Sequence, residues 1–119
     1  MAVSFIMTSV MKQMKKKGAD IIVVYIHWGE EYQEAPNAHQ VNLAQKTADM
    51  GADIIFASHP HVLQKADYVT VTGSKKQVPV FYSMGNFISN QRTETLGKPR
   101  TEQGVMAMIN LSYMEGVGI

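Results

Sequence analysis

The chain has 119 residues, of which 45% are hydrophobic, and its eleven basic and ten acidic residues give a net charge of +1. This size predicts one domain over residues 1–119, and the near-neutral charge argues against nucleic acid or an anionic membrane as a partner. Because the chain has no cysteine, any metal ion must be bound by His, Asp, Glu or Asn. No apolar run is long enough to span a membrane and no signal peptide is recognisable, so the sequence leaves the localisation unknown.

The chain begins with an amphipathic pattern that predicts a helix ending at Gly18. Its apolar positions are Val3, Ile6, Met7, Val10, Met11 and Met14. Lysines 12, 15, 16 and 17 lie mostly on its other faces or in its last turn, where cations complement the helix dipole. A phosphate or lipid patch is the alternative interpretation of these lysines.

Two near-continuous apolar runs predict buried strands at residues 19–26 and 52–57. Between them, Asn37 and Gln40 have the spacing of a capping box and predict the start of a second helix, which ends at Gly51. The expected apolar stripe of this helix is Ala38, Val41, Ala44, Gln45 and Ala48.

The segment Gly-Ala-Asp-Ile-Ile occurs twice, at residues 18–22 and 51–55, and each copy follows a helix and leads a strand that ends in histidine. Two such units predict parallel and adjacent strands joined by a right-handed crossover. Neighbouring parallel strands end at the same edge of the sheet, which is where ligands bind in open α/β sheets. We therefore expect His27 and His59 to meet.

After His61 the pattern changes to an antiparallel hairpin made of residues 67–72 and 78–82, in which Pro79 indicates an edge strand or a strand start. A loop with a glycine kink follows at residues 83–87. Residues 91–103 have no apolar periodicity and predict a mobile excursion, and residues 104–113 predict a last strand. The tail, residues 114–119, is expected to be frayed.

Three histidines, His27, His59 and His61, follow the two buried strands and are the candidate metal ligands. A single histidine at a strand end is more often a hydrogen-bonded structural residue, but three that converge indicate a metal site. Pro60 stiffens the turn between His59 and His61, and imidazole suits Zn, Mn, Fe or Ni. The fourth histidine, His39, is expected at the surface of a helix.

The other candidates each have a structural alternative. Trp28 is a candidate for substrate binding or a cover for the core. Glu30, with Glu31 and Glu34, either supplies a carboxylate or belongs to a solvated loop. Asn86 is either a ligand or substrate donor, or a left-handed turn residue.

Four motifs resemble the bacterial capsule-synthesis (CapA, poly-γ-glutamate capsule) proteins. In order, they are HWGEEY at residues 27–32, GADII at 51–55, HPHV at 59–62 and YSMGNF at 82–87. The resemblance implies a calcineurin-like metallophosphoesterase fold of the α/β class, with helix-strand-helix-strand order and a C-terminal antiparallel hairpin. It also implies that His27, His59 and His61 belong to a two-metal centre for divalent Mn, Zn or Fe.

Complete members of the family carry upstream aspartate and asparagine-histidine motifs that this chain lacks, so we expect the C-terminal part of a larger metallophosphatase-like domain. The expected partner is the N-terminal half of that domain. This expectation implies weak or absent metal binding and negligible turnover by this chain, with metal-dependent hydrolase activity in a complete protein. The alternative is a non-catalytic component of capsule polymer assembly or export that binds the anionic polymer.

Two further expectations concern association and location. An uncovered sheet would expose apolar surface, and nine methionines offer adaptable material for self-association. Family members are typically attached to the membrane and face outward through an upstream segment.

Overall fold

The computed structural model describes residues 2–112, 114 and 116, and it has the predicted α/β architecture. Its elements in chain order are α1 (Ala2–Lys16), β1 (Val23–His27), α2 (Ala38–Asp49), β2 (Ile54–Ser58), β3 (Ala66–Thr70), β4 (Gln77–Phe81) and α3 (Thr93–Leu96). The strands form one sheet in the order β1-β2-β4-β3. This arrangement confirms the predicted fold class and is compatible with a phosphoesterase-like fold. No helix among the described residues has the length and apolar character needed to cross a membrane.

The predicted parallel pair is confirmed: β1 and β2 are adjacent and parallel, with Val23 opposite Ile54 and His27 opposite Ser58. Both strands begin and end later than predicted, so His27 is the last residue of β1 and Ser58 the last of β2. The two strands therefore end side by side at the same edge of the sheet.

The predicted hairpin is also confirmed, because β3 and β4 pair antiparallel. However, β4 lies between β2 and β3 and is not an edge strand. Pro79 is tolerated because it pairs with Tyr68 in β3, whereas the ladder between β4 and β2 begins one residue later, at Val80. Proline has no backbone N–H to donate, and at Pro79 the β2–β4 ladder does not need one because it starts at Val80.

The capping box of α2 is present as predicted: Asn37 Oδ1 accepts from the Gln40 N–H at 2.9 Å, and Gln40 Oε1 accepts from the Asn37 N–H at 3.0 Å. The predicted apolar stripe is partly wrong. Val41 is 45% exposed, whereas the buried residues of the helix are Gln40, Ala44, Thr47 and Ala48. The polar members are buried because they have partners: Gln40 binds Gln64, and the Thr47 hydroxyl donates to the Leu43 carbonyl.

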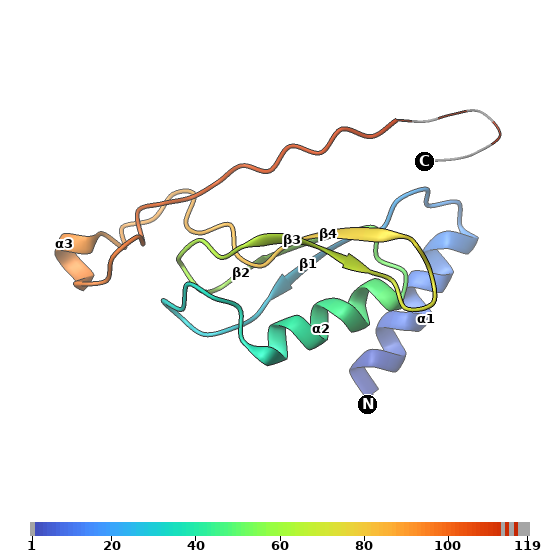
Figure 1. Ribbon diagram of the computed structural model, residues 1–119, viewed down its shortest axis with the longest axis horizontal. Coiled ribbons are helices and arrows are strands. Elements are labelled where there is room, and N and C mark those ends of the chain that lie inside the picture. Colours follow the sequence, from blue (N-terminus) through green and yellow to red (C-terminus); the bar gives the residue numbers. More distant parts are fainter. Residues whose placement is uncertain (1, 113, 115, 117–119) are drawn as a thin grey trace.

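Helices α1 and α2 lie on the same side of the sheet (Figure 1). Met11 of α1 is buried in the core, whereas Ile6, Val10 and Met14 are exposed, so only part of the predicted stripe of α1 is covered; the side chain of Val3 lies outside the described part. The core contains Met11, Ile22, Trp28, Ala44, Ala48, Ala52, Ile55, Ala57, Val78, Val80 and Tyr82.

The opposite face of the sheet, which we call the open face, is covered by no helix among the described residues. Its side chains come from alternate positions of the strands and include Val23, Tyr25, Ile54, Phe56, Tyr68, Pro79 and Phe81. Tyr25 and Tyr68 are each 65% exposed.

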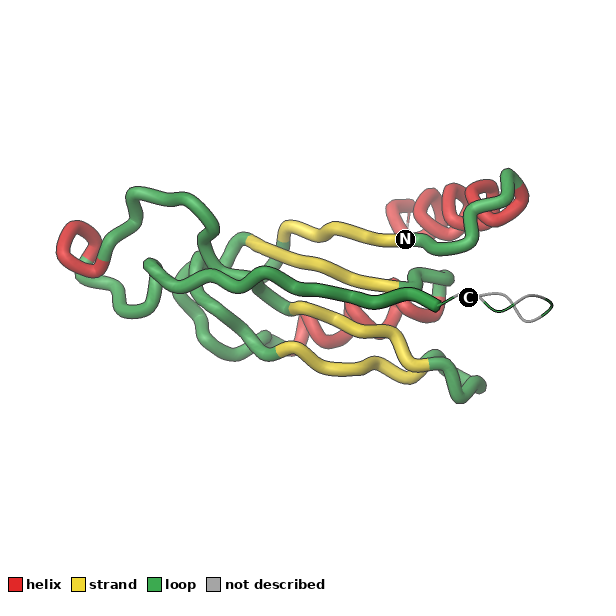
Figure 2. The backbone as a smooth tube through the Cα atoms, turned by 90° about the horizontal axis from the view of Figure 1, so that it is seen from above, coloured by secondary structure: helices red, strands yellow, loops and turns green. Residues whose placement is uncertain are grey.

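The predicted last strand at residues 104–113 is wrong for the described residues, and residue 113 lies outside them. Gly104 makes an isolated bridge with Gly85, and the chain then runs lengthwise over the open face without a ladder (Figure 2). Residues 91–103 contain the short helix α3, which the sequence did not predict, and the mobility of this segment stays a prediction. Of the tail predicted to fray, only residues 114 and 116 are described.

Candidate metal site

The turn after β2 has an unusual backbone at both of its histidines. His59 has φ 107° and His61 has φ 59°, and in the facing loop Tyr32 has φ 65°. Between the histidines, Pro60 is buried, and its carbonyl accepts a hydrogen bond from the Tyr32 N–H at 2.7 Å. Non-glycine residues at positive φ cost of order 1–3 kcal/mol each and cluster at functional sites. The surrounding structure therefore holds this turn in a conformation that directs both imidazoles to the sheet edge.

Two buried glutamines hold the loop that follows β1. Gln64 Nε2 donates to the carbonyls of Gln33 and Ala35 at 2.8 and 3.3 Å, and Gln64 Oε1 accepts from Gln40 Nε2 at 2.8 Å. This network fixes the loop that carries Glu31 against the histidine turn. Sequence patterns gave no signal for it, because a glutamine is normally read as a surface residue.

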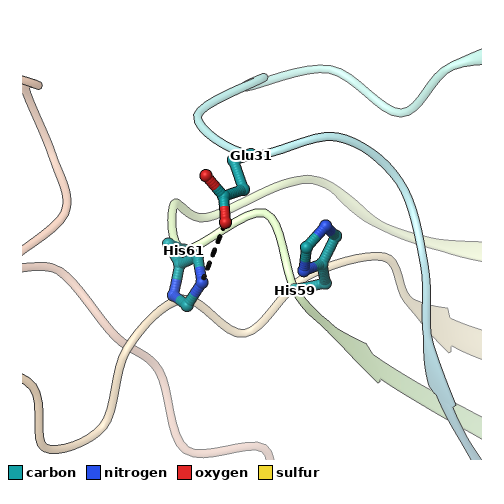
Figure 3. Close-up of side chains that lie close together, drawn as sticks. All are labelled: Glu31, His59 and His61. Carbon is teal, nitrogen blue, oxygen red and sulfur yellow. Dashed lines mark ion pairs between the residues drawn. The ribbon is translucent and has the colours of Figure 1, made fainter.

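Glu31, His59 and His61 form the cluster with metal-binding potential among the described residues. One ligand atom from each lies within 4.8 Å of the others, and His61 Nε2 is 4.0 Å from Glu31 Oε1 (Figure 3). Both histidines are half-buried and Glu31 is exposed. The cluster thus consists of two half-buried imidazoles and one carboxylate that is exposed to solvent.

His27 lies beside this cluster. The rings of His27 and His59 have centroids 4.4 Å apart, which confirms that these two residues meet, and those of His59 and His61 are 6.0 Å apart. The carboxylate of Glu31, however, completes the close group of three ligand atoms, and His27 is not part of that group. Glu31 was one of three equivalent glutamates in the sequence, and only the folded loop distinguishes it.

The donor set fits a divalent ion. Tetrahedral ligands about 2.0–2.1 Å from Zn²⁺ lie roughly 3.4 Å from one another. The separation of 4.0 Å between His61 Nε2 and Glu31 Oε1 is about 0.6 Å longer than this, and separations up to the 4.8 Å limit of the cluster are up to about 1.4 Å longer, so metal binding requires the side chains to move together by roughly these amounts. Two imidazoles and a carboxylate are ligands that Zn²⁺, Mn²⁺ and Fe²⁺ accept, and three protein ligands leave a coordination position open.

The remaining predicted site residues differ in their surroundings. Trp28 is buried, donates from Nε1 to the Tyr82 carbonyl at 2.8 Å and stacks on the Tyr82 ring, which favours the interpretation as a core cover. Glu30 and His39 are exposed, as expected for His39.

Asn86 contacts the cluster from the loop after β4. Its Oδ1 atom lies 2.9 Å from His61 Nδ1, and its Nδ2 atom donates to nearby oxygens. The left-handed residue of this loop is Gly85, with φ 68°, so Asn86 is not the turn residue that the alternative interpretation assumed.

An apolar groove of about 580 Å³ lies between the open face and the C-terminal segment. Its lining residues include Tyr25, Phe56, Phe87 and Met106, and Asn86 also lines it. Its volume is within the range of small-ligand sites.

The fold and the cluster define the class: an α/β domain that presents imidazoles and a carboxylate at the carboxyl edge of parallel strands. The profile of the bacterial capsule synthesis protein family PGA_cap matches residues 5–91. The chain belongs to this family.

Curated relatives agree with this assignment. The chain is 43% identical over 100 residues to a "Capsule biosynthesis protein CapA" of Bacillus anthracis, a match that covers 84% of the chain. It is 42% identical over 96 residues to a "PGA biosynthesis protein CapA" of Bacillus subtilis strain 168, covering 81% of the chain. In both comparisons the chain spans only 22% of the relative's length.

Proposed function

We propose that Glu31, His59 and His61 bind a divalent metal ion such as Zn, Mn or Fe, and that His27 lies beside this ion in a metallophosphatase-like site. The observation that carries the proposal is that the three ligand atoms lie within 4.8 Å of one another. Positive φ angles at both ligand histidines support it, because a strained turn is retained where it has a use.

In this proposal the complete protein is a metal-dependent hydrolase of the phosphoesterase type that acts in capsule biosynthesis. When bound, the ion would supply Lewis acidity and polarise an oxygen of the substrate. The chain's own residues have other tasks: His59 and His61 hold the site on a rigid turn, and exposed Glu31 leaves it accessible from solvent. A two-metal centre also needs a bridging ligand, which we assign to another part of the domain, so this chain alone should show negligible turnover.

The names of the relatives support the biological setting. Capsule biosynthesis is what both matched proteins are named for, and the resemblance points to a poly-γ-glutamate capsule. Because the chain spans 22% of each relative, the substrate, the membrane attachment and the partner half of the domain are all part of this proposal.

A second candidate function is non-catalytic binding of an anionic capsule polymer. One observation favours it: Lys12, Lys15, Lys16 and Lys76 line a hollow of about 310 Å³ at the end of the sheet opposite the histidines, where Lys15 and Lys76 also pair with Asp53. Lysine ammonium groups are suited to carboxylates as well as phosphates.

The test is calorimetric titration of the chain with Zn²⁺ or Mn²⁺, together with a phosphodiester hydrolysis assay in the presence of the metal. We expect binding at one site of modest affinity that is lost in His59→Ala, strongly weakened in Glu31→Gln and unchanged in the matched surface control His39→Ala. Circular dichroism checks that each variant is folded. Metal binding that survives His59→Ala would exclude the proposed site of Glu31, His59 and His61. Robust hydrolysis by this chain alone would show that turnover does not depend on the other half of the domain.

A further inference from the structure

The side-chain amide of Asn86 has an orientation that its surroundings dictate. Its Nδ2 atom donates to the carbonyls of His61 and Thr101 at 3.3 and 2.9 Å and lies 3.2 Å from Gln91 Oε1. Backbone carbonyls only accept hydrogen bonds, so the opposite orientation of the amide would place Asn86 Oδ1 against two acceptors. The oxygen must therefore face His61 Nδ1, at 2.9 Å.

This orientation determines where a neutral His61 carries its proton. Because Asn86 Oδ1 is only an acceptor, His61 Nδ1 must be the donor. A neutral imidazole has a single N–H, so its lone pair is then on Nε2. Nε2 is the atom that faces Glu31, at 4.0 Å. The lone pair thus points into the proposed metal site.

We infer that Asn86 is a positioning residue that holds His61 in the Nδ1–H tautomer and presents Nε2 as the metal ligand. The inference rests on the proposed metal site for its function. Its geometric part stands on the hydrogen bonds of Asn86 alone. Outer partners of this kind fix the ring orientation of ligating histidines and typically change metal affinity by about 10- to 100-fold.

Residues 101–104 also hold Asn86 in place. Thr101, whose carbonyl accepts from Asn86 Nδ2, is buried, and the Gln103 carbonyl accepts from the Asn86 backbone N–H at 3.3 Å. The two chain segments cross so closely that a Cβ at Gly85 would lie 2.3 Å from the Gln103 carbonyl oxygen, and one at Gly104 would lie 2.2 Å from that of Asn86. Glycines at the crossing therefore allow residues 101–104 to reach Asn86 and hold its amide.

The test begins with metal-free protein labelled with ¹⁵N, in which long-range proton–nitrogen correlation spectra at a pH where His61 is neutral identify the nitrogen that bears the proton. We expect the Nδ1–H form for His61 in the wild type and a mixture of tautomers in Asn86→Ala. Zn²⁺ affinity measured by calorimetry should fall by about 10- to 100-fold in Asn86→Ala. The control is Asn90→Ala, an exposed asparagine in the same loop, which should change neither readout.

A second variant keeps the inference testable if Asn86→Ala disturbs the loop. Asn86→Asp retains an acceptor for His61 Nδ1 but sets its other oxygen against the carbonyls of His61 and Thr101, so it should keep the Nδ1–H tautomer at a cost in loop stability, whereas Asn86→Ala should not keep it. An Nε2–H tautomer in the wild type, or an unchanged tautomer and affinity in Asn86→Ala, would overturn the inference. An Nδ1–H tautomer in a wild type that binds no metal would instead uphold the role of Asn86 toward the ring and refute the proposed function.

Discussion

Asp53 joins separate parts of the fold, and its removal is the perturbation with the clearest expected cost. Its carboxylate accepts a hydrogen bond from the Ile22 N–H at 2.8 Å, just before β1, and one from Lys15 at the end of α1 at 3.2 Å. It also accepts one from Lys76, which precedes β4. The Asp53 side chain is only 20% exposed, whereas each lysine is 44% exposed.

The magnitude follows from these partners. Asp53→Asn keeps an acceptor for the Ile22 N–H and loses two partly exposed ion pairs, which are worth about 0.2–1 kcal/mol each, so we expect a loss of about 1 kcal/mol. Asp53→Ala also leaves the Ile22 N–H without its partner, which costs a further 1–3 kcal/mol or so. We therefore expect Asp53→Ala to lower the free energy of unfolding by about 2–4 kcal/mol.

The same contacts predict a pH dependence. Burial raises the pKa of Asp53, but the hydrogen bonds from Lys76, Ile22 and Lys15 outweigh it, and the net pKa lies below its ordinary value of 3.8. A lowered folded-state pKa gives stabilisation that is complete above the unfolded value and is lost as the pH falls through the folded value. The stability contributed by Asp53 should therefore disappear as the pH is lowered below about 3.8.

Urea denaturation of the wild type, both variants and Asp20→Asn measures these effects. Asp20 is the matched control because it occupies the same position in the other copy of Gly-Ala-Asp-Ile-Ile, where its side chain is exposed. We expect Asp20→Asn to be nearly neutral and Asp53→Asn to reduce the acid-dependent part of the unfolding free energy. Equal stabilities of the two Asn variants, or an unchanged acid dependence in Asp53→Asn, would refute the reasoning.

Further predictions concern the site loop and the open face. Gly29→Ala should lower the free energy of unfolding by about 1–3 kcal/mol, because Gly29 has φ 83° and a Cβ there would lie 2.8 Å from the Gln40 side chain. The control is Gly73→Ala, because Gly73 has a similar φ of 72° but a Cβ there would meet no atom within 4 Å. Chemical denaturation of both variants separates the effect of the clash from that of the backbone strain. Equal losses in the two variants would contradict the clash. The chain should self-associate through the open face, and Tyr25→Lys should weaken this association; sedimentation that shows a clean wild-type monomer at high concentration would count against it.

Local signals predicted the secondary structure well. Continuous β-branched runs identified the two parallel strands, and β2 is mostly buried as predicted, but the prediction of a buried strand is wrong for β1, an edge strand whose residues are exposed or half-buried. Asn37 with Gln40 identified the start of α2, because capping involves groups only three residues apart. The repeated Gly-Ala-Asp-Ile-Ile and the crossover rule were sufficient to predict that β1 and β2 are parallel neighbours and that His27 meets His59.

Other predictions failed where a partner from elsewhere in the chain decided the outcome. Gln40 is buried because Gln64 satisfies its amide, which shifts the buried face of α2 away from Val41. The segment after Gly104 has the composition of a strand, but its described residues belong to no strand of the sheet, so this part of the chain is irregular.

The sequence by itself determined the order of the elements from α1 to β4, the parallel pairing of β1 with β2 and the delivery of histidines to one edge of the sheet. Only the tertiary structure decided that Glu31, among three glutamates in its loop, faces His61, and that Asn86 holds the imidazole from the other side. The physical reason is the range of the forces involved. Periodicity and capping act within a few residues, whereas the choice of a ligand depends on loops that buried hydrogen bonds bring together from distant parts of the chain.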